Sequence, residues 1–445
     1  MYQTDFSPEE LAGRRKRILE AIGSDALALI QGAEKGNAHD LFRQTNDFCY
    51  LSGVEVPHAY LLLDGRAQSC ALFLPHQSPE RREREGEILS AENATAVRQL
   101  TGMDAVYGIE ELSVLLEGAK VLYTPLRMAE GAMMSWDTLR RAQQEITSDP
   151  WDGRPDRMRA FVALLRQRCP TAEIRDLGPI TEDMRLIKSP TEIALLRKAG
   201  ELCAIGVLEA MRATRPGIWE YQLDAVMRYT YLVNGARDAG YRAIIAGGPN
   251  IRYSHYNANN AQLADGDLVL VDSAPDYHYY TSDVGRMWPT NGRYTDAQRE
   301  LYGFVVEYHK AYLDLVRPGV TADQVVAEAA ERMRGVVERT AFSKPAYEKG
   351  ARATLEFPYH MSHPVGMAVH DVSDYRGRVL QPGTVLSLDP SLWVPEEHLY
   401  IRVEDTVLVT GNGIENLTAD APLELHDVEQ TMKQEGLLQR YAALW

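Results

Sequence analysis

The sequence predicts two domains: an α/β domain, then a domain in which long helices mix with short strands. Three observations lead to this prediction. The chain has 445 residues, enough for two or three domains that each have a hydrophobic core. Strand and helix signals alternate until about residue 175. The pattern changes near residues 176–190, so we expect an amino-terminal domain over residues 1–176 and a second domain over residues 177–445.

Each element of the first domain has its own local signal. Ser7, Pro8 and the two glutamates that follow are typical of a helix start and predict a helix over residues 7–22. The apolar runs ALALIQG, AYLLLDG and CALFLP predict three strands. The charged run SPERREREGE, residues 78–87, is expected to form a solvent-exposed helix face or loop.

The second domain opens on a strong helix start. Ser189 is a typical N-cap, Pro190 takes the first helical position, and Glu192 completes the pattern of a capping box. Apolar periodicity predicts four long helices in this domain, over residues 190–213, 218–234, 295–316 and 321–338.

Composition limits the functions open to the chain. The formal net charge of -16 argues against non-specific binding to nucleic acid or to an anionic membrane. No apolar run reaches the roughly 18 residues of a membrane-spanning helix, and the first 19 residues lack the apolar core of a signal peptide. We therefore expect a cytoplasmic protein. No metal-binding spacing joins the cysteines, so we expect buried, reduced thiols at Cys49, Cys70, Cys169 and Cys203.

Two aspartates follow apolar runs in the stretch LVLVDSAPDYHYYTSDVGR. We place the centre of a hairpin at Tyr277 and His278. On that register Asp272 pairs with Asp283, and both carboxylates lie on one face with Cβ atoms roughly 5 Å apart. Two carboxylates this close in a buried site need a shared proton or a cation. The alternative is a loop with two solvated aspartates.

Three downstream segments carry further metal-ligating side chains. YHMSHPVGMAVHD, residues 359–371, holds three histidines, VLSLDPSLW leads an apolar run into an aspartate, and LYIRVEDTVLV places a glutamate inside an apolar strand. Acids at such positions are costly to bury unless they are paired or bound to metal. One cation site explains them all, with ligands Asp272, Asp283, His363, Asp389 and Glu404. Such ligands suit Mn(II), Fe(II), Co(II) or Zn(II), and their number fits two ions roughly 3.5 to 4 Å apart with a bridging hydroxide.

Together these motifs resemble the pita-bread metallopeptidases, the family of aminopeptidase P and prolidase. FRQTNDFCYLSG resembles part of the aminopeptidase P amino-terminal domain, and MRLIKSPTEIALLRKAG resembles the start of its catalytic domain. Residues 265–302 carry the family's two-aspartate motif. The resemblance implies an α/β amino-terminal domain followed by an α+β pita-bread (creatinase/aminopeptidase-like) catalytic domain. It also implies two divalent metal ions, Mn(II) first with Co, Zn or Fe as alternatives, and cleavage of the bond before proline.

The resemblance gives each ligand a role. Asp272 would chelate one metal, and Asp283 and Glu404 would bridge both. His363 and Asp389 would complete the shell of the second metal. Position 389 departs from the family pattern, because the usual residue there is glutamate and Asp389 is one methylene shorter. We expect Asp389 to reach its metal through a shifted backbone or a water, or else to leave the second site weak.

Four further residues match positions around the substrate. His255 matches a histidine of the substrate pocket, and His370 one near the scissile bond. Arg402 precedes the bridging glutamate by two residues, and Trp393 stands where tyrosine is common. By this resemblance His255 or His370 would help stabilise the oxyanion, while Asp389 would carry the proton from water to the proline nitrogen. Tyr359 stands where the family usually has histidine, although the next residue, His360, is a histidine.

Several functions stay open on the sequence alone. The leading hypothesis is an Xaa-Pro aminopeptidase that acts on proline-containing peptides, and an Xaa-Pro dipeptidase is the alternative. The remodelled segment 389–393 also allows a hydrolase with another small substrate. A weakly active relative with a binding role is a further alternative, although four of five ligands match the family. The resemblance also implies a homodimer or homotetramer.

Overall fold

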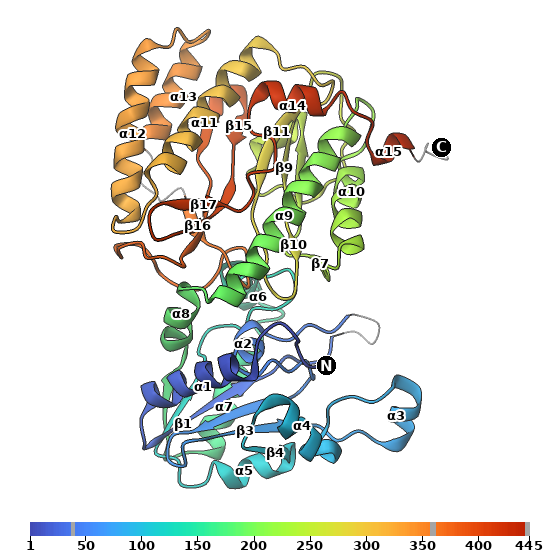
Figure 1. The fold of residues 1–445 in the computed structure, drawn as a ribbon, viewed down its shortest axis with the longest axis vertical. Helices are drawn as coiled ribbons and strands as arrows, with labels where there is room; N and C mark the ends of the chain where they lie inside the picture. Colours follow the sequence, from blue (N-terminus) through green and yellow to red (C-terminus); the bar gives the residue numbers. More distant parts are fainter. Residues whose placement is uncertain (37–40, 357–361, 441–445) are drawn as a thin grey trace. The chain divides into compact units, whose positions relative to one another are not determined.

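The computed structural model describes residues 1–36, 41–356 and 362–440. The chain forms two compact units, Met1–Arg185 and Leu186–Trp445 (Figure 1). The division falls near the end of helix α8 (Gly178–Leu186), whereas the boundary expected from the sequence lies just before this helix. Among the described residues, no helix is both long and apolar enough to cross a lipid bilayer.

The first unit is built around one mixed sheet. Its strand order is β4-β3-β2-β1-β5-β6, with bounds β1 Ala26–Gln31, β2 Tyr60–Asp64, β3 Ser69–Leu74, β4 Ala105–Gly108, β5 Val121–Thr124 and β6 Glu173–Asp176. The helices of this unit are α1 Pro8–Ile22, α2 Asn46–Ser52, α3 Pro79–Glu85, α4 Ala94–Thr101, α5 Leu112–Leu115, α6 Trp136–Ser148, α7 Arg157–Arg168 and α8. The predicted first helix and the three predicted strands are confirmed. The charged run forms α3, which buries none of its residues.

Long helices frame the strands of the second unit. They are α9 Pro190–Ala213, α10 Glu220–Val233, α11 Asp296–Leu315, α12 Ala322–Arg339 and α13 Pro345–Leu355, followed by the shorter α14 Leu425–Thr431 and α15 Leu437–Arg440. The four predicted long helices are confirmed. The capping box also forms, because Ser189 Oγ accepts from the Glu192 N–H at 3.2 Å and Glu192 Oε2 accepts from the Ser189 N–H at 3.0 Å.

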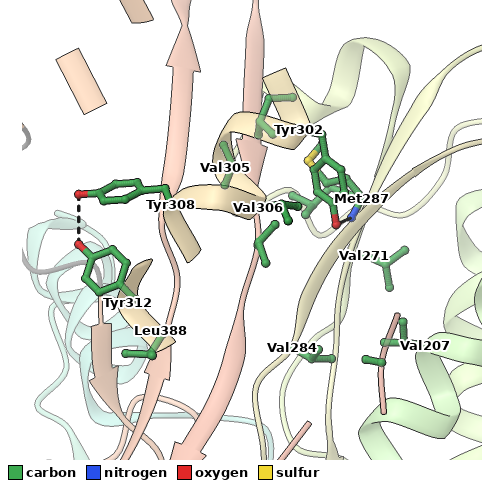
Figure 2. Packing of buried hydrophobic residues seen from close by; sticks show 14 of the residues in the cluster. Val207, Val271, Val284, Met287, Tyr302, Val305, Val306, Tyr308, Tyr312 and Leu388 are labelled. Atoms are coloured by element: carbon green, nitrogen blue, oxygen red, sulfur yellow. Dashed lines mark hydrogen bonds between the residues drawn. The ribbon is translucent and has the colours of Figure 1, made fainter. Parts of the chain in front are cut away.

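The strands of this unit form small antiparallel sheets. Their bounds are β7 Asp238–Ala239, β8 Ile244–Gly247, β9 Leu268–Asp272, β10 Pro275–Asp276, β11 Gly285–Pro289, β12 Ser362–Pro364, β13 Val385–Leu388, β14 Ser391–Val394, β15 Leu399–Arg402, β16 Asp405–Val409 and β17 Ile414–Asn416. The larger sheets have the orders β11-β9-β8 and β12-β13-β16-β17. Figure 2 shows part of the core, in which Val207 of α9, Val305 of α11 and Met287 of β11 belong to one buried cluster. Strands packed on both faces explain the continuous apolar runs in the sequence.

The hairpin that carries the two aspartates turns one residue later than predicted. Tyr277 and Tyr280 exchange backbone hydrogen bonds of 2.8 and 3.0 Å. Between them His278 and Tyr279 both have positive φ, at 50° and 75°. Two left-handed residues make a turn whose twist matches that of the flanking strands. The centre therefore lies between His278 and Tyr279, and the predicted centre at Tyr277 and His278 is wrong.

This change moves the strand register by two residues. Asp272 pairs with Gly285, so its predicted pairing with Asp283 is also wrong. Asp283 lies two positions before Gly285 and is a diagonal neighbour of Asp272, which keeps both carboxylates on one face. A Cβ atom at Gly285 would lie 2.3 Å from Glu404 Oε2. Glycine at this position therefore makes room for a third carboxylate.

Candidate metal centre

Three buried carboxylates meet where the strands of the second unit converge. Asp272 ends β9, Asp283 precedes β11, and Glu404 lies between β15 and β16. Each offers an oxygen within 4.8 Å of the others, and each residue is less than 5% exposed. Three acids so close together repel one another strongly in a buried site. The structure thus brings together three of the five predicted ligands and creates a demand for positive charge.

Arg402 and His363 meet part of this demand. The Arg402 guanidinium contacts Asp272 and also lies 3.1 Å from Glu404 Oε1. His363 Nε2 lies 3.2 Å from Asp283 Oδ2, while Nδ1 lies 3.2 Å from the Pro364 carbonyl. Burial alone would lower the pKa of His363, but the hydrogen bond and charge of Asp283 raise it to about 9. With Nδ1 held by a carbonyl, Nε2 is aimed at the carboxylates, which is the orientation of a metal-ligating imidazole.

Two oxygen atoms at this site are buried and lack a hydrogen-bond partner within the described part of the chain. They are Glu404 Oε2 and Asp389 Oδ1. Burial raises the pKa of Glu404 well above its usual value. It also raises the pKa of Asp389 to about 6, against the attraction of His363 and Arg402. Unpartnered buried carboxylate oxygens are costly, and four carboxylates with one imidazole suit a first-row divalent cation. The residues present therefore fit the predicted metal ions.

Asp389 stands slightly apart from the other acids. It follows β13 and is half-buried, and it is not a member of the group whose ligand atoms all lie within 4.8 Å. Its charge still interacts with His363, Arg402 and Asp283. Its role as a ligand of the second ion stays a prediction.

Two residues that contact the carboxylates were not predicted. The Tyr241 hydroxyl lies 2.6 Å from Asp272 Oδ1 and 2.9 Å from Asp283 Oδ1. The Thr406 hydroxyl accepts from the Asp283 N–H at 2.8 Å and lies 2.9 Å from the Asp283 carbonyl. Both residues orient the aspartates. No sequence signal marks them, because tyrosine and threonine are ordinary residues in apolar strands and the loops around them.

The predicted substrate histidines occupy different surroundings. The ring centroids of His370 and His363 lie 4.3 Å apart, and the two ring planes make an angle of 66°. His255 is exposed in the loop after the 3₁₀-helix η3 (Gly248–Arg252), with Nδ1 3.3 Å from Ser254 Oγ. The structure therefore places His370 beside a predicted ligand and His255 at the surface. Tyr359 and His360 lie outside the described residues.

An aromatic pair connects the carboxylates to the surface. Trp393 of β14 pairs with Tyr400 of β15, and their ring centroids lie 4.4 Å apart. The Arg402 guanidinium carbon lies 5.8 Å from the centroid of the Tyr400 ring. Trp393 is 41% exposed, whereas Arg402 is buried. The three side chains form a path along two strands from solvent to the acidic cluster.

Comparison with known proteins matches both units. The sequence profile of metallopeptidase family M24 matches residues 194–411, and that of the aminopeptidase P N-terminal domain matches residues 11–123. The chain is 31% identical to an Xaa-Pro aminopeptidase of Escherichia coli (strain K12), covering 96% of this chain and 98% of that relative. It is 32% identical to Xaa-Pro aminopeptidase 3 of Rattus norvegicus, covering 87% of this chain and 76% of that relative.

Solved structures give the same result. Proline aminopeptidase P II from Yersinia pestis aligns with a TM-score of 0.79 at 32% identity, covering 96% of this chain and all of that one. Zinc-substituted E. coli aminopeptidase P in complex with product aligns with a TM-score of 0.78 at 30% identity, covering 97% and 99%. The predicted family and fold class are confirmed. The chain belongs to metallopeptidase family M24 and carries the aminopeptidase P N-terminal domain ahead of a pita-bread catalytic domain.

Proposed function

We propose that the chain is an Xaa-Pro aminopeptidase, which hydrolyses the bond before proline at the amino terminus of peptides. The observation that carries this proposal is the cluster of Asp272, Asp283 and Glu404, whose buried negative charge is only partly balanced. The relatives named Xaa-Pro aminopeptidase align over nearly the whole chain, which supports this choice of substrate.

Five residues would hold two divalent cations, and we propose Mn(II), with Co, Zn or Fe as alternatives. They are Asp272, Asp283, His363, Asp389 and Glu404. Bound cations lower the pKa of a water toward neutrality and polarise a carbonyl. Tyr241 would keep the first two aspartates oriented, since its hydroxyl reaches both.

Asp389 suits the role of proton carrier. Its Oδ1 atom is buried and lacks a hydrogen-bond partner within the described residues, so this oxygen is open to accept a proton. Asp389 would take the proton of the attacking water and deliver it to the proline nitrogen as the peptide bond breaks. His370, beside His363, would donate a hydrogen bond to the oxyanion that forms on the carbonyl. His255 would reach the substrate from its surface loop.

The aromatic residues Trp393 and Tyr400 would bind the substrate. Trp393, backed by the ring of buried Tyr400, offers an exposed apolar surface to the proline ring, since aromatic faces bind apolar rings well. Arg402 at the inner end keeps the carboxylates in place. We also propose that the chain works in the cytoplasm as a homodimer or homotetramer. Light scattering in solution tests the number of subunits.

One experiment tests this function. The protein is stripped with a chelator and reloaded with Mn(II), and its metal content is measured by elemental analysis. Turnover is then measured on an Xaa-Pro tripeptide, on the matching Xaa-Ala tripeptide and on an Xaa-Pro dipeptide. We expect two metals per chain and strong preference for the Xaa-Pro tripeptide. Preference for the dipeptide would replace aminopeptidase with dipeptidase, and no proline preference would contradict the proposal.

The Asp389→Glu variant is the matched comparison. It restores the longer side chain that the family resemblance implies. If Asp389 reaches its metal, this variant binds the same number of cations as the unmodified chain. A gain from one cation to two would show that the shorter side chain weakens the second site.

A further inference from the structure

A second buried charged cluster lies next to the candidate metal centre. It consists of Arg286 on β11, His309 on α11 and Asp405 at the start of β16, each no more than 1% exposed. Asp405 Oδ1 accepts from Arg286 Nη2 at 2.7 Å and from Thr418 Oγ1 at 2.6 Å. Asp405 Oδ2 lies 2.7 Å from His309 Nε2. Unlike Glu404, its neighbour in the chain, Asp405 therefore has a partner on each oxygen.

This cluster holds the backbone of the metal centre. Arg286 Nη1 donates to the carbonyl of Gly285 at 3.0 Å and to the carbonyl of Glu404. The same two residues are bridged directly, since the Glu404 N–H donates to the Gly285 carbonyl at 2.9 Å. Gly285 is the position whose missing Cβ makes room for the Glu404 carboxylate. A shift of Arg286 therefore changes the place of a predicted metal ligand.

The hydrogen bonds indicate how His309 acts. Its Nδ1 is buried and lacks a hydrogen-bond partner within the described residues. An ionised carboxylate can only accept hydrogen bonds, so the proton of this contact lies on Nε2. His309 thus donates to Asp405 from Nε2.

His309 supplies the donor to Oδ2 of Asp405. Arg286 and Thr418 both bind Oδ1, so removal of His309 leaves Oδ2 buried without a partner. A buried carboxylate oxygen without a partner is costly, and rotation of the carboxylate toward another donor would disturb its bond to Arg286.

We propose that His309 is a positioning residue for the metal centre, which acts through Asp405 and Arg286 on the backbone of Gly285 and Glu404. The inference rests on the proposed function, because it assigns Glu404 to the metal. It predicts that a side chain on α11, with no contact to any predicted ligand, sets the affinity of the site for cations. Partners beyond the ligands themselves commonly change metal affinity by about 10- to 100-fold.

The test compares two variants of the full-length chain. His309→Leu removes the donor and keeps an apolar side chain, whereas His309→Gln keeps an amide N–H that reaches toward Asp405. Calorimetric titration of the metal-free proteins with Mn(II) should show about 10-fold weaker binding for His309→Leu. His309→Gln should return to within about threefold of the unmodified chain. Tyr308→Phe is the control on the same helix, since its hydroxyl faces Tyr312 at 3.4 Å (Figure 2) and not Asp405.

The outcomes separate positioning from packing. Equal losses of affinity in His309→Leu and His309→Gln would overturn the proposal, as would unchanged affinity in His309→Leu. If His309→Leu does not fold, Thr418→Val takes its place, because it removes the hydroxyl that donates to the other oxygen of Asp405. Thr418→Val should also weaken Mn(II) binding, and unchanged affinity in this variant would overturn the proposal. Failure of the unmodified chain to bind cations would overturn both proposals. Binding of cations without cleavage of any Xaa-Pro peptide would overturn the proposed function alone.

Discussion

Glu404 and Asp405 are neighbours in the chain but belong to buried clusters with opposite properties. Glu404 forms a bridge to Gly285 directly before β16, and successive residues of extended backbone point to opposite faces, which separates the two side chains. Both oxygens of Asp405 have partners, and its pKa is held below its usual range because Arg286 and His309 outweigh the effect of burial. Glu404 Oε2 is unpartnered within the described residues, and burial raises its pKa.

The difference separates a structural charge cluster from a binding site. Around Asp405 one acid faces one arginine and two further donors, His309 and Thr418. Around Glu404, four acids share the ion pairs of Arg402 and His363 within the described part of the chain. A buried cluster whose negative charge exceeds its fixed positive charge is favourable only when a proton or a cation binds. Both clusters bury acids, but only around Glu404 do the acids outnumber the positive side chains, and this excess indicates a metal site.

Exchange of Glu404 for its amide should give the largest effect. Glu404→Gln removes a predicted bridging ligand, and loss of metal-assisted catalysis costs several kcal/mol of transition-state stabilisation. We expect turnover of an Xaa-Pro peptide to fall by at least about 1000-fold. Stability of the metal-free chain should stay within about 1 kcal/mol or rise, since Arg402 keeps its contact with Asp272. Peptide turnover and urea unfolding in the presence of chelator measure the two effects.

Exchange of Asp405 for its amide should lower the stability of the fold. Asp405→Asn removes the charge that balances buried Arg286, and breaking a buried ion pair costs about 3–5 kcal/mol. Urea unfolding of the metal-free protein should show this loss, whereas Glu404→Gln shows none. If both variants lost equal stability, the distinction between the two clusters would fail.

The ligands could be predicted because each is an acid or histidine at an unexpected place. Asp272 and Asp389 end apolar runs, and Glu404 interrupts an apolar run that is predicted as one strand and forms β15 and β16 in the structure. The long helices could be predicted from their caps and apolar periodicity, as at Ser189. These signals are local, so one sequence is enough to reveal them.

Long-range features could not be predicted in the same way. His278 and Tyr279 adopt left-handed conformations without the Asn-Gly or Asp-Gly signal of such turns. Tyr241 and His309 gain their roles from partners 31 and 96 residues away. A tyrosine in a loop or a histidine on a buried helix face carries no local mark of its partner, so its contribution emerges only from the fold.

The smallest expected effect comes from an exposed ion pair with similar geometry. Arg197 of α9 binds Glu415 of β17 through two hydrogen bonds, of 2.7 and 2.8 Å, and the side chains are 50% and 38% exposed. The distances match that of Arg286 to Asp405, but water screens the charges. Arg197→Gln should therefore cost less than about 1 kcal/mol in urea unfolding. The loss should shrink further at 1 M salt, where the screening length is about 3 Å. A salt-independent cost of several kcal/mol would mean that hydrogen-bond geometry, and not burial, sets the strength of these pairs, and the contrast between Glu404 and Asp405 would then need another explanation.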